Sequence, residues 1–287
     1  MGILPVIVSA ALVFNYILPS IYRYLNPKEY TVKHVLDNIP DRRPLLVKIK
    51  KEIDVKNLSS TLRKQKTIVV TGDSHAVDIS LALQLHLADT DKRVALLHSI
   101  CDPLALNSIS VTMKDLYDNH PQDKTKRPKY CLRHHAEYLR NLTKHSPDLI
   151  IFSEAWRLDA LPYLSQTIKE IKAASTAKVL ILGRNFSFRQ HPNVALRSLT
   201  NIDKIDEIAW EKRIRFDQYD TQLMKIAKDT GSYFLSKNDI VCPDQNCKIL
   251  FDLEMGYTDQ AHWSLVGMKY YGNILINHEI FKVAIND

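Results

Sequence analysis

The chain has 287 residues and a net charge of +7, with 45% hydrophobic residues and only seven glycines. These values indicate a globular protein with a full core, long enough for one large domain or two small ones, and the scarcity of glycine argues against a Gly-rich nucleotide-binding design. The charge is uneven, because residues 19–66 hold twelve Lys or Arg against five Asp or Glu and so account for the whole excess.

Residues 1–24 are predicted to form a membrane helix or membrane anchor. The run Ile3–Leu18 is almost wholly apolar, and Tyr22 and Tyr24 follow it as an interfacial aromatic belt would. A cleaved signal peptide needs a positive region before its apolar core, whereas the first basic residue here is Arg23. A buried core helix is the alternative interpretation.

Residues 25–66 are predicted to be a basic connector in which Pro40 and Pro44 interrupt helical patches. The positive charge favours contact with an anionic membrane surface or an acidic glycan, and a solvated helix without a partner is the alternative. A nucleic-acid partner is not expected, because the connector has few aromatic residues and matches no known nucleic-acid-binding module. Taken alone, the positive-inside rule places the connector in the cytoplasm, unless earlier loops of a larger membrane protein set the topology.

Residues 67–287 alternate between strand and helix patterns and are predicted to form one catalytic domain. The alternation is typical of an α/β fold with a doubly wound parallel sheet in three layers, α/β/α. The polar segment Asp102–Tyr130 is long enough to be a functional loop or lid. Strands are predicted at Thr67–Thr71, Arg93–His98, Asp148–Ser153, Lys178–Gly183 and Ser232–Leu235, and helices at Ala76–Leu87, Arg133–His145, Leu161–Ala174, Ala209–Lys228 and Ser264–Asn277.

The first strand runs into the turn Gly72-Asp73-Ser74, and a helix pattern follows directly. Ligands of parallel α/β sheets bind outside the carboxyl ends of the strands, and a helix N-terminus presents backbone N–H groups there. Ser74 is therefore a candidate nucleophile whose own N–H can help to hold an oxyanion. A helix-capping serine with no further role is the alternative.

The second motif lies near the other end of the chain, where Asp259 and His262 stand three residues apart before the last predicted helix. Such a pair can supply a general base and the carboxylate that orients it. Together with Ser74 it completes the three parts of a catalytic triad, whose order along the chain is free.

The two motifs together resemble the SGNH (GDSL-type) hydrolase superfamily, and within it most of all the SGNH domain fused to membrane acyltransferase-3 proteins, which O-acylate bacterial surface polysaccharides. The resemblance covers Thr67 to Ile285. It implies the flavodoxin-like SGNH fold and a Ser-His-Asp triad. It further implies an O-acyltransferase that moves an acyl group, typically acetyl, through a Ser74 acyl-enzyme to a hydroxyl of an extracytoplasmic polysaccharide.

The same resemblance implies a membrane-anchored catalytic domain in the periplasm or at the cell surface that binds no cofactor itself. The acyl donor, ultimately acetyl-CoA, would reach it through an upstream acyltransferase-3 membrane domain. Two other functions are open: an esterase that deacylates a glycan or lipid, and a catalytically silent glycan-binding module. The intact Ser74, Asp259 and His262 argue against the silent module.

The oxyanion hole departs from the superfamily pattern, which has a Gly after the second strand and an Asn after the third. Here the second strand ends in His-Ser-Ile-Cys-Asp and the third in Phe-Ser-Glu-Ala-Trp-Arg, with neither residue. Losing one such donor costs about 3–4 kcal/mol of transition-state stabilisation. The candidate pocket or oxyanion residues are Cys101 after the second strand, Trp156 and Arg157 after the third, and Asn185 after the fourth. A turn asparagine is the alternative interpretation of Asn185.

The four cysteines are compatible with two disulfides in an oxidising compartment. The loop from Cys242 to Cys247 is short enough to close on itself, and the resemblance favours the pairs Cys101–Cys131 and Cys242–Cys247. A zinc site is the alternative, but the spacing lacks paired C-x-x-C elements, so no metal site is predicted.

Overall fold

The computed structural model describes residues 25–39, 41, 66–98, 139–140, 146–158 and 161–286. Outside these ranges lie the predicted 1–24 membrane helix, most of the basic connector, Cys101, Cys131, the segment Asp102–Tyr130 and all but two residues of the predicted helix Arg133–His145. Within the described part of the chain, no helix is both long enough and apolar enough to cross a membrane.

Five strands form one parallel sheet, and all five predicted strands are confirmed to within two residues. The order in the sheet is β2-β1-β3-β4-β5, which is the predicted flavodoxin-like order. The order in which strands are added to the sheet reverses between β1 and β3, so the carboxyl ends of these two neighbouring strands form the crevice where such folds bind ligands. The strands are β1 (Lys66–Gly72), β2 (Lys92–His98), β3 (Leu149–Phe152), β4 (Lys178–Leu182) and β5 (Tyr233–Leu235), each paired in parallel with its neighbour.

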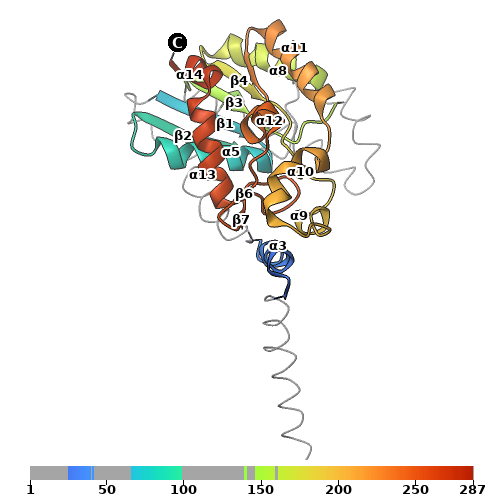
Figure 1. Cartoon of the computed structure of the whole chain (residues 1–287). Coiled ribbons are helices and arrows are strands. Elements are labelled where there is room, and N and C mark those ends of the chain that lie inside the picture. Colours follow the sequence, from blue (N-terminus) through green and yellow to red (C-terminus); the bar gives the residue numbers. More distant parts are fainter. Residues whose placement is uncertain are drawn as a thin grey trace, which may run out of the picture.

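Helices cover both faces of the sheet and give the predicted three layers (Figure 1). Alternate strand residues point to opposite faces, so Val69 and Val70 of β1 belong to two separate hydrophobic cores. One core packs against α5 (Ser74–Leu87), α13 (Leu265–Asn277) and α14 (Glu279–Asn286). The other packs against α8 (Leu161–Ala174) and α11 (Asp217–Thr230). Burial on both faces explains why the strands read as continuous apolar runs.

Helices α5 and α13 approach closely because Gly272 of α13 faces the backbone of α5. A Cβ at Gly272 would lie 3.0 Å from the carbonyl oxygen of Ala82. This contact positions the site, since α5 begins at Ser74 and α13 begins three residues after His262.

The predicted helix Ala209–Lys228 is wrong, because the structure has two helices there, α10 (Ile205–Lys212) and α11. Between them Arg213 forms a β-bridge with Phe188, and Ile214 N–H donates to the Ser187 carbonyl at 2.7 Å. Pairing with this distant segment takes the place of helical hydrogen bonds at Arg213 and Ile214.

Several short elements were not predicted individually. They are α9 (Pro192–Ala195), η4 (Ile202–Lys204), α12 (Lys237–Val241), η5 (Pro243–Gln245), the hairpin of β6 (Leu250–Phe251) and β7 (Glu254–Met255), and α14. Helix α3 (Pro27–Asp37) is one of the helical patches expected in the connector. Its residues Val32, Val35 and Leu36 are buried in the core on the α13 face of the sheet, so this part of the connector packs on the domain.

Candidate active site

The nucleophile turn begins at Gly72, the last residue of β1. Its φ is 137°, and a Cβ there would lie 2.2 Å from the Ser153 carbonyl oxygen, so only glycine fits. Asp73 caps α5: its Oδ1 accepts from His75 N–H at 2.9 Å and its Oδ2 from Ala155 N–H at 3.0 Å. The ends of β1 and β3 are thereby tied together, with Ser74 as the first residue of the helix.

The base loop is built around Asp259. Its Oδ1 accepts from the backbone N–H groups of Ala261 and His262 at 2.9 and 3.0 Å, and its Oδ2 lies 2.7 Å from His262 Nδ1. A carboxylate can only accept, so we assign the ring proton of His262 to Nδ1. Nε2 is then an acceptor.

The acceptor nitrogen of His262 faces the nucleophile. Nε2 lies 2.8 Å from Ser74 Oγ, although the two residues are 188 positions apart in the chain. The structure therefore brings the three residues Ser74, His262 and Asp259 together in hydrogen-bond contact, with the geometry of a nucleophile, a base and an orienting carboxylate.

The electrostatics of Asp259 suit the orienting position. Partial burial raises the pKa of its carboxyl, but the hydrogen bonds from the His262 ring and from two backbone N–H groups outweigh burial, and the pKa lies well below its ordinary value. Asp259 thus stays ionised at neutral pH and can stabilise a protonated His262.

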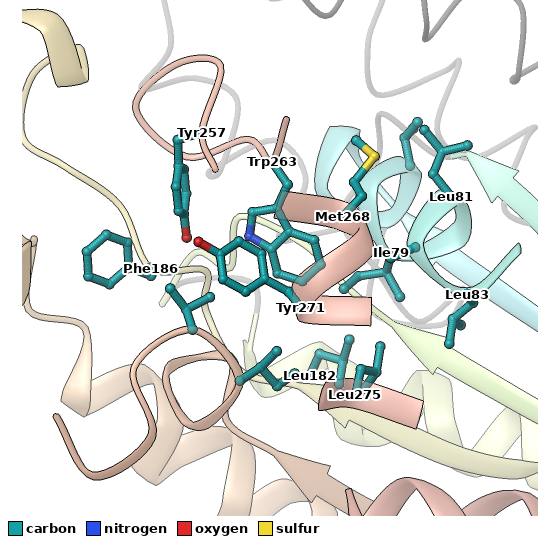
Figure 2. Close-up of a cluster of buried hydrophobic side chains, with 14 of the residues drawn as sticks. Ile79, Leu81, Leu83, Leu182, Phe186, Tyr257, Trp263, Met268, Tyr271 and Leu275 are labelled. Atoms are coloured by element: carbon teal, nitrogen blue, oxygen red, sulfur yellow. The ribbon is translucent and has the colours of Figure 1, made fainter. Parts of the chain in front are cut away.

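An aromatic cluster supports the base loop from below. Trp263 and Tyr271 pack ring against ring with centroids 4.9 Å apart, and Tyr257 lies beside them (Figure 2). All three are almost completely buried. The backbone N–H of Trp263 donates to Asp78 Oδ2 at 3.1 Å, which ties the residue after His262 to helix α5.

Asn185, a candidate oxyanion donor, is used elsewhere. Its Nδ2 donates to the Ala261 carbonyl in the base loop and lies 3.3 Å from His75 Nδ1. Both amide hydrogens are therefore directed at these two acceptors. In this structure Asn185 is a brace between β4 and the base loop and is not an oxyanion donor.

Comparison with known proteins identifies the family. Residues 47–277 match the family described as "SGNH domain (fused to AT3 domains)". The chain belongs to this SGNH family. No curated protein matches the chain. Among solved structures, the Salmonella ser. Paratyphi A lipopolysaccharide acetyltransferase periplasmic domain is similar, with a TM-score of 0.56 and 14% identity over 84% of this chain and 98% of that one.

Trp156 does not line a pocket in this SGNH domain, contrary to its prediction. Its side chain is only 1% exposed, and its Nε1–H donates to the Leu182 carbonyl at 2.7 Å. An indole that is buried in the core cannot contact a glycan bound at the surface. Arg157 is half-buried next to it, and its role stays a prediction, as does that of Cys101, which lies outside the described residues.

A buried lysine, Lys237, is a feature that sequence reasoning missed. Its side chain is 1% exposed and interacts electrostatically with four carboxylates, those of Asp73, Asp78, Glu154 and Asp220. Burial lowers the pKa of the Lys237 ammonium to about 8, and the carboxylates offset only part of that effect. Asp73 and Asp78 brace the nucleophile turn and Trp263, so this ammonium balances charge directly behind the site.

The sequence predicts no role for His75, whose ring lies close to Asp78 and His262. One ligand atom of each residue lies within 4.8 Å of the others, an arrangement that could hold a metal ion. The ring nitrogens of His262 are already engaged, Nδ1 by Asp259 and Nε2 by Ser74. A metal would have to displace one of these partners, so the geometry fits the SGNH triad better than a metal site.

The predicted disulfide Cys242–Cys247 is confirmed, with an S–S distance of 2.10 Å. It closes the loop that follows α12. Directly after this loop, the backbone N–H groups of Ile249 and Leu250 donate to Asp206 Oδ1 at 2.7 and 2.9 Å. The predicted pair Cys101–Cys131 lies outside the described part of the chain.

Proposed function

We propose that this SGNH domain is an O-acyltransferase that carries an acyl group, specifically acetyl, on Ser74 and passes it to a hydroxyl of an extracytoplasmic bacterial polysaccharide. The observation that carries the proposal is the pair of bonds made by one imidazole. His262 faces Ser74 Oγ through Nε2 at 2.8 Å and Asp259 through Nδ1 at 2.7 Å.

The first half-reaction loads the serine. His262 Nε2 takes the Ser74 hydroxyl proton as Oγ attacks the acyl carbonyl, and Asp259 stabilises the imidazolium that forms. Collapse of the tetrahedral intermediate breaks the bond to the donor's leaving group, which takes the proton from Nε2. The products are the Ser74 ester and a neutral His262.

The second half-reaction transfers the acyl group from Ser74 to the acceptor. An acceptor hydroxyl gives its proton to Nε2 and attacks the Ser74 ester carbonyl. Oγ leaves and recovers that proton, so the acyl group ends on the acceptor and the enzyme is unchanged. Such base assistance is worth about 10²–10⁴-fold.

The arrangement of hydrogen-bond donors around Ser74 favours acyl transfer over hydrolysis. The Ser74 N–H, at the start of α5, is suitably placed for an oxyanion. Ala155 N–H bonds to Asp73 and Asn185 Nδ2 bonds to Ala261, so neither is free to help. Among the described residues this leaves the Ser74 N–H as the donor at this position, which gives attack by bulk water little support, whereas a bound hydroxyl gains an effective molarity of about 10⁵ M or more.

The family and the disulfide support the setting of this reaction. The family description names fusion to AT3 domains, which supports a membrane acyltransferase partner that delivers the acyl group, ultimately from acetyl-CoA, with no cofactor bound by this domain. The similar solved structure is the periplasmic part of a lipopolysaccharide acetyltransferase. The Cys242–Cys247 bridge fits an oxidising compartment. Residues 1–24 would anchor the domain to the membrane.

The test uses the full chain with a chromogenic acetyl ester, in the presence and absence of polysaccharide from the bacterial envelope. We expect slow hydrolysis, faster ester consumption with the acceptor, acetylated polysaccharide, and an acetyl mass on the Ser74 peptide. Ser74→Ala should abolish all four signals. The matched control is Ser80→Ala on the same helix, since Ser80 Oγ only donates to the Ala76 carbonyl at 2.7 Å.

Two outcomes would replace the proposal. Fast Ser74-dependent hydrolysis with no acetylated polysaccharide would identify an esterase. A folded protein that neither turns over the ester nor acetylates Ser74, yet binds the polysaccharide, would identify a glycan-binding module.

A further inference from the structure

The face of the base His262 is covered by a second imidazole. His75 follows Ser74 directly and is 6% exposed. Its ring stacks on the His262 ring with centroids 4.8 Å apart and planes 20° from parallel. Such a stack restricts rotation of the His262 ring about the bond that would swing it away from Ser74 and Asp259.

The contact with Asn185 allows the protonation of His75 to be assigned. The Ala261 carbonyl can only accept, so the Asn185 atom that faces it must be the amide nitrogen. The same nitrogen lies 3.3 Å from His75 Nδ1. We therefore assign Nδ1 as the acceptor of this contact, which places the ring proton on Nε2 and makes His75 the neutral imidazole. Asn185 thus ties the stacked ring to the loop that holds the base.

Neutrality matters because His262 must become positive during the reaction. A protonated His75 would place a second cation in the stack, and it would also present a donor to the Asn185 amide, which is itself a donor. Like charges at this distance make protonation of His262 harder. Protonation of His75 would therefore both loosen the brace and weaken the base.

The charged groups around His75 come from four segments of the chain. Asp73 and Asp78 flank it on the nucleophile turn and on α5, and one Asp78 ligand atom lies within 4.8 Å of a nitrogen of each imidazole. Asp259 stands behind His262 in the base loop. Lys237 of α12 interacts with Asp73 and Asp78, which limits how strongly these carboxylates favour a positive His75.

We propose that His75 is a positioning residue that holds the base His262 against Ser74 and Asp259, and that it does so only as the neutral imidazole. The inference rests on the proposed function for its activity readout. In this arrangement Asn185 links His75, the residue after Ser74, to the base loop.

The experiment compares His75→Ala, which removes the stack and the acceptor, with His75→Phe, which keeps the stack and removes the acceptor. His86→Phe on the same helix is the matched control, since the His86 ring packs on α13 beside Gly272, its Nε2 lies 2.7 Å from the Lys269 carbonyl oxygen, and neither contact involves the triad residues. Thermal unfolding checks each variant. Two measurements follow: the pH profile of kcat/KM for the acetyl ester, and the proton NMR signal of the His262 Nδ1–H, which persists only while the ring is held on Asp259.

We expect His75→Ala to lose the Nδ1–H signal and to lower kcat by about 10- to 100-fold with KM within about twofold. His75→Phe should recover part of both. The acid limb of the wild-type profile should need two proton losses and that of His75→Phe only one. His86→Phe should match the wild type in every measurement.

A folded His75→Ala or His75→Phe that keeps wild-type kcat, the wild-type acid limb and the Nδ1–H signal would overturn the inference. The NMR measurement needs no substrate. If the wild type lacks ester turnover while the signal still depends on His75, the positioning role stands and the proposed function fails.

Discussion

The indole N–H of Trp156 donates to the carbonyl oxygen of Leu182 at 2.7 Å. This bond joins the segment after β3 to the last residue of β4, and the carbonyl of Trp156 in turn accepts from Arg184 Nη1 at 2.7 Å. Trp156 therefore fixes the spacing of the two strand ends that lie beside the nucleophile turn, from within the core.

Substitution of Trp156 should affect stability rather than acceptor use. Trp156→Ala should lower the free energy of unfolding by about 3–5 kcal/mol through loss of buried volume. Trp156→Phe, which leaves the Leu182 carbonyl unpaired, should cost about 1–3 kcal/mol. Urea unfolding measures both. Hydrolysis and acceptor-dependent transfer should change in parallel, and a selective loss of transfer in Trp156→Phe would mean that the indole contacts the acceptor after all.

Asp259→Asn should reduce kcat by about 10⁴-fold with little change in KM. The amide presents a donor where His262 needs an acceptor, so the ring proton moves to Nε2 and the base can no longer receive the Ser74 proton. Steady-state ester kinetics at neutral pH measure the effect. Asp229→Asn, which removes an exposed carboxylate paired with Lys225, is the control. A loss smaller than about tenfold would remove Asp259 from the triad.

Replacing Cys242 and Cys247 together by serine should lower the free energy of unfolding by about 2 kcal/mol, the loop-closure entropy expected for so short a loop. Activity should persist, since neither sulfur touches the triad. Urea unfolding of the wild type and of the double variant, each with and without reductant, distinguishes the two bridges. Any effect of reductant on the double variant must come from the predicted Cys101–Cys131 bridge. Mass spectrometry of unreduced protein should find no free thiol, and a wild-type stability insensitive to reductant would contradict both predictions.

Lys237 gives a prediction for alkaline pH. Its folded-state pKa, about 8, lies below the ordinary value of 10.5, so between these values the unfolded chain binds more protons and stability contributed by this group rises with pH. The wild type should therefore gain about 3 kcal/mol relative to Lys237→Met as pH rises from 7.5 to 10.5. Denaturant unfolding across this range measures the difference. A difference that stays constant or falls would show that Lys237 titrates normally.

Much of this architecture was predictable because its signals are local. The strands are short β-branched apolar runs, and their alternation with helix patterns implied a parallel sheet. The contact of Ser74, His262 and Asp259 was predictable because Asp259 and His262 lie three residues apart and Ser74 follows a strand directly. In each case neighbouring residues along the chain carry the information.

The predictions that were wrong or missing concern residues whose structure depends on contacts with segments far away in the sequence. Nothing between Lys212 and Asp217 breaks a helix, and only pairing with the segment at Phe188 interrupts it. Trp156 follows the strand end as expected, but the direction of its side chain is set by the Leu182 carbonyl. Lys237 stands in a polar string that reads as a loop, and its burial depends on carboxylates from three other segments.

The 188-residue separation between Ser74 and His262 has a consequence for biosynthesis. The chain is made from its N-terminus, so the serine is complete long before its base exists. Until α13 docks on α5, the Ser74 hydroxyl is an ordinary alcohol. Under the proposed function, the nascent chain therefore cannot attack activated acyl groups that it meets during synthesis, and Ser74 becomes reactive only as the last helices fold into place.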